Sequence, residues 1–352
     1  MTLVTDAARE RDAGEQASAA TMPVAVMPVD AVSVGTAASV DAPASGGTGG
    51  PASLATVYDP AEPVELRSTL APLARGPYDP TTQFDAEGVW RTFVSPVGPV
   101  TLRLTQARLG APVHARAWGP GAEWAIDGVP ALLGRDDDWS QLDLSRHPFL
   151  AETRRRNPGL RLPATRRVFE ALAPAIIEQK VTSLEAYREW ARLVTAFGHP
   201  APGPATHVPA RLRVAPTPQE WRYLPSWEWH RAGVDPTRSR TLVGAAARAE
   251  AIERVTDAGT LTALGGIGPW TAAETFQRSH GDPDRISLGD YHVPHFVGYA
   301  LAGDRHCDDA GMLELLAPWA GQRQRIVRLI LASGRLPERR GARATITDHR
   351  RR

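Results

Sequence analysis

The chain has 352 residues, of which 42% are hydrophobic and 22% charged, and this composition suits one or two globular domains with tails. Its formal net charge of +1 gives no overall basic character that would indicate a nucleic-acid partner. Only a local basic groove could indicate one. Cys307 is the single cysteine, which excludes an intramolecular disulfide, a thiolate zinc site and a four-cysteine iron–sulfur cluster.

Residues 1–60 are rich in Ala, Gly, Pro, Ser, Thr and Val without a helical period, which predicts a disordered N-terminal tail. This segment carries two Arg and seven acidic residues, a net charge of −5. Acidic residues precede any apolar run, and no run approaches the length needed to span a bilayer. The sequence therefore favours neither a secretory signal nor a membrane helix, and we expect a soluble protein in a reducing cytoplasm.

Residues 61–146 have the pattern of a small β-rich domain. Apolar residues alternate or cluster in three runs, 89–94, 100–104 and 113–118. Pro-Val-Gly-Pro and Gly-Pro-Gly sequences punctuate these runs, as turns do. The pattern predicts short antiparallel strands.

From residue 147 to residue 333 the pattern becomes helical. In the segment 169–182, apolar residues recur at a three-four spacing that makes one face of a helix a core face: Phe169, Leu172, Ala173, Ile176 and Ile177. Further helical segments are predicted over 237–252 and 312–331. An aromatic cluster over 221–229 is interpreted as core packing, with base stacking as the alternative.

The last segment, 334–352, carries seven Arg and two acidic residues, a net charge of +5, and is predicted to be a basic C-terminal tail. The fold class expected for the whole chain is α+β. It consists of a mainly α-helical bundle preceded by a small antiparallel β-sheet domain.

The strongest motif of the chain lies within residues 257–295. Leu261, Leu264 and Ile267 supply apolar anchors on either side of a glycine-rich turn. Pro269 stands where proline is tolerated at the start of a helix. The pattern predicts two helices joined by a tight hairpin.

This hairpin is a candidate clamp for a DNA backbone. The amides of Gly266 and Gly268 and the free N–H groups at the start of the following helix can face one phosphate. The helix dipole adds attraction for the negative charge. The alternative is an ordinary helix–turn–helix with a glycine C-cap.

Downstream of the hairpin, Ser287-Leu288-Gly289-Asp290-Tyr291-His292 places an acid just after a glycine at the expected entrance to another helix. An N-cap is the ordinary role of Asp at such a position. Hairpin and acid together resemble the helix–hairpin–helix DNA glycosylases with a Gly/Pro-rich loop and a catalytic Asp, and most closely the AlkA-like 3-methyladenine DNA glycosylase II branch. In that family a Leu-x-x-Leu-x-Gly-Ile-Gly-x-Trp-Thr-Ala hairpin precedes the catalytic aspartate at this distance, and Asp290 is the match.

The resemblance covers residues 147–333 and, more loosely, 64–146, and it implies further site residues. Gln179 and Lys180 match the positions of the family's DNA-penetrating turn, where a side chain fills the gap left by the flipped nucleotide. The best-known members have leucine there, so Lys180, the only lysine of the chain, is a departure. Trp270 matches a pocket tryptophan, with packing in the helical bundle as its alternative. Where the branch can have a second aromatic residue, this chain has Glu274.

The resemblance also implies DNA contacts by Thr271 in the hairpin motif and by His292 beside the acid. The lyase members of the superfamily carry a lysine where this chain has Trp270, which favours a monofunctional enzyme. A Schiff base at Lys180 is the alternative, because a lysine of depressed pKa can attack an abasic sugar.

The expected activity is hydrolysis of an N-glycosidic bond in damaged double-stranded DNA. A carboxylate stabilises the oxocarbenium-like transition state and orients the attacking water, and an alkylated purine leaves readily because its ring is cationic. An aromatic wall favours such a base. The alternatives are a glycosylase for deaminated or oxidised bases and a non-catalytic helix–hairpin–helix DNA-binding protein.

No cofactor is expected, although a structural monovalent cation at the hairpin stays open. We expect a monomer whose partner is DNA and not a membrane, associated with the nucleoid when bound.

Overall fold

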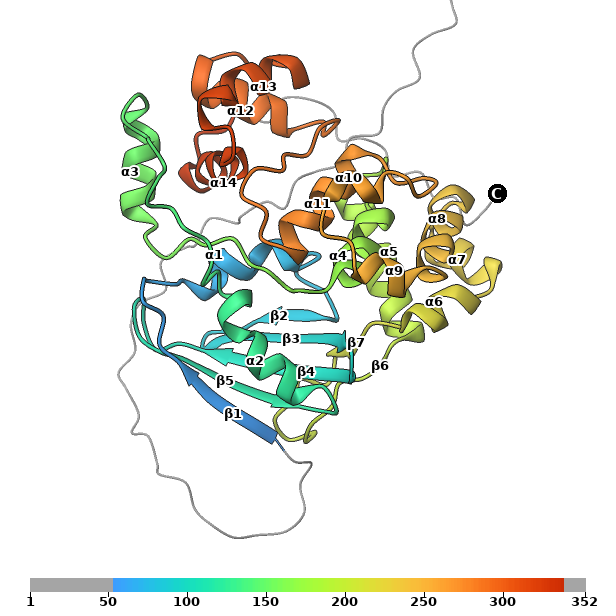
Figure 1. The fold of residues 1–352 in the computed structure, drawn as a ribbon. Coiled ribbons are helices and arrows are strands. Elements are labelled where there is room, and N and C mark those ends of the chain that lie inside the picture. Colours follow the sequence, from blue (N-terminus) through green and yellow to red (C-terminus); the bar gives the residue numbers. More distant parts are fainter. Residues whose placement is uncertain (1–52, 339–352) are drawn as a thin grey trace, which may run out of the picture.

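The computed structural model describes residues 53–338. Residues 1–52 and 339–352 lie outside it, and most of the two predicted tails falls there. In the described part, a five-stranded antiparallel sheet lies on one side and most of the helices lie on the other (Figure 1). This arrangement confirms the predicted α+β class. Among residues 53–338, none of the helices combines the length and the apolar character needed to cross a membrane.

The sheet has the strand order β1-β5-β4-β3-β2, and every neighbouring pair is antiparallel. Its strands are β1 (Ser53–Tyr58), β2 (Thr82–Phe84), β3 (Gly88–Ser95), β4 (Gly98–Thr105) and β5 (Val113–Trp118). Helix α2 (Ala122–Leu132) lies across one face and shares a buried apolar core with β3, β4 and β5 (Figure 1). The three predicted runs are thus confirmed as β3, β4 and β5.

The predicted end of the N-terminal tail at residue 60 is wrong, because β1 occupies Ser53–Tyr58. This strand pairs along its length with β5, from Ser53 opposite Trp118 to Tyr58 opposite Val113. It is an edge strand, and most of its side chains are exposed. Thr56, Val57 and Tyr58 are residue types that favour a strand. An edge strand with exposed side chains needs no apolar alternation, however, so no periodic signal marks it.

The helical part contains two groups of helices, each with its own buried core. The sheet part contributes α1 (Leu66–Leu70) and the short turn η1 (Ala71–Leu73) to the boundary between the parts. The first group comprises α4 (Val168–Ile177), α5 (Ser183–Phe197), α6 (Pro218–Tyr223), α7 (Ser226–Ala232), α8 (Pro236–Ala246), α9 (Ala249–Glu253), α10 (Ala258–Leu261) and α11 (Pro269–Ser279), with the short strands β6 (His199–Pro200) and β7 (Arg213–Val214) beside it. The second comprises α3 (Pro148–Arg156), α12 (Val293–Ala302), α13 (Asp309–Leu316), η2 (Ala317–Trp319) and α14 (Arg323–Ser333) (Figure 1).

Two predicted helical segments are each divided in the structure. The segment 237–252 becomes α8 and α9, because the backbone of Arg248 leaves the helical region at φ −120° and ψ 16°. The segment 312–331 becomes α13, η2 and α14, and Pro318, which has no backbone N–H to donate, lies in the intervening turn. A helical period continues across such breaks, and it therefore could not locate them.

The aromatic cluster over residues 221–229 was predicted to pack in the core, and this is confirmed for two of its side chains. Trp221 and Trp229 are buried and their rings stack with centroids 5.4 Å apart. Tyr223 and Trp227 are exposed instead. Helices α6 and α7 therefore bury one aromatic side chain each and leave another at the surface.

Candidate active site

The glycine hairpin lies between α10 and α11, as predicted. Leu261 and Ile267 are buried on either side of the turn, and the backbone N–H of Ile267 donates to the carbonyl of Leu264 at 3.0 Å. Pro269 is the first residue of α11. The following N–H groups of the first turn point out of the helix end, which is where an anion is attracted.

Gly266 and Gly268 differ in what their backbones require. Gly266 has φ +84°, and a Cβ built on it would lie 2.2 Å from Oγ1 of Thr241 on α8. Gly268 has ordinary extended backbone, with φ −94° and ψ 178°, and a Cβ there would meet no atom within 4 Å. The fold therefore requires glycine at position 266. At position 268 the fold does not require glycine, and the missing side chain leaves room there for an external ligand.

Gln179 joins the turn after α4 to the hairpin. Its Nε2 donates to the carbonyl of Gly266 at 2.9 Å and to Oγ1 of Thr271 at 2.8 Å. Thr271 is only 2% exposed. The amide of Gln179 and the hydroxyl of Thr271 thus serve the contact between turn and hairpin, and the buried side chain of Thr271 is not presented to a ligand outside the protein.

Lys180 is the exposed residue of this turn. Its backbone is left-handed, with φ +54°. Thr182 and Glu185 close the other side of the turn as a capping box at the start of α5. The turn therefore presents the Lys180 side chain to solvent from a fixed backbone.

A buried arginine, Arg238, binds the end of α4 just before this turn. Nη1 of Arg238 on α8 donates to the carbonyl of Ile177, the last residue of α4, at 2.5 Å. The same atom lies 2.6 Å from Oε2 of Glu189 on α5, and Nη2 donates to Oε1 of Glu189 at 3.1 Å. Arg238 therefore connects three helices immediately before the turn that carries Gln179 and Lys180.

Asp290 is buried, with 6% of its surface exposed. Its Oδ2 accepts a hydrogen bond from Nε1 of Trp270 at 3.0 Å. Its Oδ1 accepts from the backbone N–H groups of His292 at 2.8 Å and Val293 at 3.0 Å, at the start of α12. One oxygen thus performs the capping work expected of an Asp here, and the other faces the tryptophan of the hairpin helix.

Burial raises the pKa of Asp290 to about 6. The hydrogen bond from Trp270 acts in the opposite direction, the charge of Glu274 raises the pKa, and the two backbone N–H donors lower it. The carboxyl group is therefore ionised at neutral pH but held close to its titration.

Asp290 and Trp270 line a cavity between the two helix groups, which holds about 730 Å³ including its open mouth. Its other polar lining residues are Glu178, Glu274, Gln277, Arg278, Ser287, Gln324 and Arg328. Pro72 from η1 also lines it, and the carbonyl of Pro72 accepts from Nε of Arg278 at 2.9 Å. The sheet part therefore helps to close this cavity.

Glu274 is not an isolated negative charge in this cavity. Its Oε2 lies 2.7 Å from Nη1 of Arg278, and its Oε1 accepts a hydrogen bond from the hydroxyl of Ser287. Because its charge is balanced by Arg278, Glu274 attracts a cationic base only weakly.

His292 is the N-cap residue of α12, and its ring stacks on Phe296 with centroids 5.7 Å apart. The neighbouring Tyr291 is 50% exposed. At this corner Tyr291 is therefore more accessible to a macromolecular ligand than His292, and sequence reasoning had not singled it out.

The residues from 53 to 338 contain no group of three or more His, Cys, Asp or Glu side chains able to hold a metal ion. At the hairpin, the carbonyls of Leu264 and Gly266 accept hydrogen bonds from Ile267 and Gln179. A monovalent cation there would use backbone carbonyls, and it stays a prediction.

Comparisons with solved structures place this geometry among known folds. A 3-methyladenine DNA glycosylase from Archaeoglobus fulgidus aligns over 79% of this chain and 98% of its own, with 17% identity and a TM-score of 0.61. An apo 8-oxoguanine glycosylase/lyase from Clostridium acetobutylicum aligns over 79% and 98%, with 12% identity and a TM-score of 0.58. The chain has the AlkA-like helix–hairpin–helix glycosylase fold.

A curated relative shares part of this glycosylase-fold sequence. It is a probable bifunctional transcriptional activator/DNA repair enzyme AlkA of Mycobacterium tuberculosis, 31% identical over 165 residues. The match covers 42% of this chain and 30% of the relative, so the chain spans less than a third of the length of that protein. No family model matches the chain.

Sequence reasoning did not identify Arg278 and Arg328, the two arginines that line the cavity with Asp290. Glu274 and Arg278 stand four residues apart on α11, a spacing that predicts an ion pair on a helix, and this signal was available. Arg328 on α14 comes from the second helix group and donates from Nη2 to the carbonyl of Ser68 at 2.9 Å. No local pattern links α14 to α1 and the cavity, so Arg328 could not have been found from the sequence.

Proposed function

We propose that this protein is a monofunctional DNA glycosylase that excises alkylated purines, of the 3-methyladenine type, in base excision repair. The observation that carries the proposal is the buried Asp290, which lines a cavity with Trp270 directly beside the glycine hairpin. Damaged duplex DNA is the proposed partner, a monomer is the proposed acting unit, and the reaction uses no cofactor.

In this proposal the target nucleotide leaves the duplex and its base enters the cavity. Cleavage of the N-glycosidic bond develops positive charge on the sugar, which the ionised Asp290 stabilises while it orients water. The hydrogen bond from Trp270 to Oδ2 fixes the orientation of the carboxylate beside the cavity that both residues line. The hairpin fixes the backbone phosphate, and the turn at Lys180 fills the space that the nucleotide leaves.

An alkylated purine suits the Trp270 wall because an electron-rich ring attracts a cationic base. The names of the relatives support this substrate class, since one similar structure is a 3-methyladenine DNA glycosylase and the curated relative is a probable DNA repair enzyme. The alkylated base needs little assistance from an acid because it leaves as a neutral molecule.

A second candidate is a glycosylase for a neutral, oxidised or deaminated base. Arg328 lines the cavity, and its buried Nε has no hydrogen-bond partner within residues 53–338. A guanidinium at this place suits a base with acceptor atoms better than a base that carries a positive charge.

Base release from a panel of defined duplexes tests both candidates. The panel holds 3-methyladenine, 7-methylguanine, hypoxanthine and 8-oxoguanine at one position in otherwise identical strands. Preferential release of the methylated purines supports the proposal, and preferential release of hypoxanthine or 8-oxoguanine supports the second candidate. Duplex binding without release of any base would leave the non-catalytic DNA-binding alternative.

The rate of base release is expected to depend on pH through Asp290. Because the carboxylate form is the active one and burial raises its pKa to about 6, the single-turnover rate should increase as pH rises through about 6 and then level off. A single-turnover series from pH 4.5 to 8.5 measures this profile. A rate that stays constant between pH 5 and pH 7 would contradict the assignment.

The two hairpin glycines provide a matched test of the phosphate contact. Gly268→Ala is expected to leave the free energy of unfolding within about 0.5 kcal/mol of wild type, since its Cβ meets no protein atom, but to weaken binding to damaged and undamaged duplexes alike. Gly266→Ala is expected to lower the melting temperature as well, because its Cβ collides with Thr241. Thermal unfolding and fluorescence anisotropy with both duplexes separate the effects, and unchanged DNA binding by Gly268→Ala would place the contact elsewhere.

Lys180 is expected to act as a plug or phosphate contact and not as a nucleophile. Lys180→Ala should lower affinity for lesion DNA and soften its salt dependence while some base release continues, because one cationic contact is lost. Wild type should leave abasic sites uncut. A borohydride-trapped protein–DNA adduct that disappears in Lys180→Ala would instead establish the Schiff-base alternative and a bifunctional enzyme.

A further inference from the structure

The walls of the Asp290 cavity come from one face of each of two helices. The lining residues on α11 and α14 recur at a spacing of three and four, so those of each helix lie on a single face. They are Trp270, Glu274, Gln277 and Arg278 on α11, and Gln324, Val327, Arg328 and Leu331 on α14. A base in this cavity therefore meets side chains of both helices.

Gln324 differs from the other polar side chains that line this cavity. Those side chains contact the protein, as Gln277 does when its Nε2 donates to the carbonyl of Arg285 at 2.9 Å and to Oγ of Ser287 at 3.1 Å. Gln324 is 6% exposed, and its amide makes no hydrogen bond within residues 53–338. Neither amide atom is among the side-chain atoms that are fully enclosed and lack a partner. The amide is therefore open to the cavity, where a ligand can bind it.

The backbone of Gln324 is held in place although its amide is free. Gln324 is the second residue of α14, and its backbone N–H donates to the carbonyl of Pro283 at 2.9 Å. The backbone N–H and Nε of the preceding Arg323 both donate to Oδ1 of Asp284, at 3.0 Å and 2.7 Å. The start of α14 is thus fixed on the chain at 283–284. The amide can turn at the end of its side chain without moving the helix.

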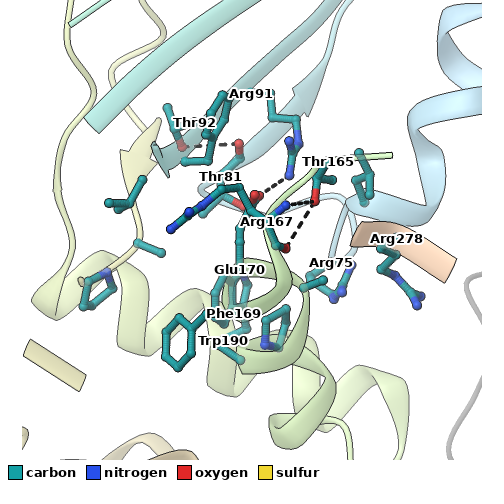
Figure 2. A pocket seen from close by; sticks show the side chains of 18 of the residues that line it. Arg75, Thr81, Arg91, Thr92, Thr165, Arg167, Phe169, Glu170, Trp190 and Arg278 are labelled. Atoms are coloured by element: carbon teal, nitrogen blue, oxygen red, sulfur yellow. Dashed lines mark hydrogen bonds and ion pairs between the residues drawn. The ribbon is translucent and has the colours of Figure 1, made fainter. Parts of the chain in front are cut away.

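A second cavity, between the sheet part and the first helix group, differs in this respect (Figure 2). Arg91 of β3 and Glu170 of α4 line it and pair with each other, as Figure 2 shows. Nε of Arg91 and Oε2 of Glu170 have no hydrogen-bond partner in the part of the chain that the structure describes, but both are fully enclosed by protein. A ligand in that cavity cannot reach them. The Asp290 cavity is therefore the better place for a hydrogen-bonded ligand.

Two methylated purines share one edge that carries no methyl group. The methyl group of 3-methyladenine lies on the minor-groove edge, and that of 7-methylguanine lies at N7 on the major-groove edge. The Watson–Crick edge is free in both, and enzymes that flip a base read this edge. Adenine presents there an N6–H donor beside the acceptor N1, whereas guanine presents the acceptor O6 beside an N1–H donor.

We propose that Gln324 reads the Watson–Crick edge of the flipped base, and that its freely turning amide lets one cavity accept lesions of both adenine and guanine. In one orientation its carbonyl accepts from N6–H of adenine and its NH₂ group donates to N1. After half a turn the carbonyl accepts from N1–H of guanine and the NH₂ group donates to O6. Gln324 is thus a specificity-determining residue, and this role rests on the proposed function.

Gln324→Glu tests the reading of this edge. A carboxylate only accepts, so it matches the adjacent N1–H and N2–H donors of guanine but meets the acceptor N1 of adenine with a second acceptor. The ratio of the single-turnover release rates, 7-methylguanine over 3-methyladenine, should therefore rise about tenfold or more. The added negative charge attracts both cationic bases alike, so the ratio isolates the hydrogen bonds.

Gln324→Leu removes the amide at similar volume and should slow the release of both bases about tenfold. Gln324→Met replaces it if the Leu variant fails to fold. Gln322→Leu is a matched control, because Gln322 lies outside the cavity lining and its Nε2 donates to the carbonyl of Gln141 at 3.2 Å. This control should keep the wild-type ratio. An unchanged ratio in folded Gln324→Glu, or wild-type rates in Gln324→Leu, would overturn the proposal.

Binding of the free bases tests Gln324 without catalysis. Ligand-observed NMR titration of the full chain with 3-methyladenine and with 7-methylguanine gives both Kd values in the absence of DNA. Gln324→Glu should shift their ratio about tenfold in favour of 7-methylguanine. If wild type releases neither base from DNA, the proposed function fails while this ratio still tests Gln324. An unchanged Kd ratio, or no binding of either free base to wild type, would overturn the assignment.

Discussion

Asp290→Asn is expected to reduce the single-turnover rate of base release by roughly a hundredfold or more, the usual loss when one electrostatic catalyst is removed from a buried site. The neutral amide cannot stabilise positive charge on the sugar. It still offers an oxygen to the backbone N–H groups of His292 and Val293, so the start of α12 should be preserved. Binding of lesion DNA is expected to persist.

The same variant has a predictable effect on stability. Burial raises the pKa of Asp290 to about 6 in the folded protein, above its value of 3.8 in an unfolded chain, so the fold favours the protonated form. That contribution is fully present below pH 3.8 and is lost as pH rises through about 6. Wild type should therefore gain stability relative to Asp290→Asn when pH is lowered from 7.5 to 5, as melting temperatures would show. If a folded Asp290→Asn protein released bases at the wild-type rate, the role of Asp290 would be limited to capping α12.

Arg238→Ala is expected to lower the free energy of unfolding by about 3 to 5 kcal/mol, because it leaves Glu189 buried without a counter-charge. It also removes the donor to the carbonyl of Ile177 at the end of α4. Urea denaturation monitored by circular dichroism measures the loss.

A matched control lies on the surface of the same helix group. Arg231 pairs with Glu228 on α7, but its side chain is 73% exposed. Arg231→Ala should therefore cost no more than about 1 kcal/mol. Equal losses in the two variants would contradict the role assigned to the buried ion pair. If Arg238 also positions the turn, a folded Arg238→Ala protein should bind lesion DNA less tightly than Arg231→Ala.

The sequence predicted those elements whose signal is local. Strands β3, β4 and β5 alternate apolar residues between turns, and the glycine hairpin has its apolar anchors and Pro269 within one short stretch. Strand β1 could not be predicted, because its stability comes from pairing with β5 and its own side chains are mostly exposed. Local patterns therefore gave the type of fold but not the edge of its sheet.

At the site, single residues were easier to predict than their contacts. Asp290, Trp270 and Glu274, each singled out from the sequence, line one cavity. The sequence could not indicate that Arg328 of α14 lines the same cavity, or that the Gln179 amide binds the hairpin. Both facts depend on how helices distant in the chain pack together, and a one-dimensional pattern does not contain that geometry.

If Lys180 contacts DNA as proposed, its backbone conformation opposes stability to activity at one position. A left-handed residue with a Cβ costs roughly 1 kcal/mol or more relative to glycine, which adopts that conformation freely. Selection of variants for heat resistance alone should therefore enrich glycine at this position and remove the only lysine of the chain. Under the proposed function, thermostable variants obtained in that way would be more stable and would bind lesion DNA less tightly. The fold at this turn would then be held below its attainable stability by the Lys180 side chain.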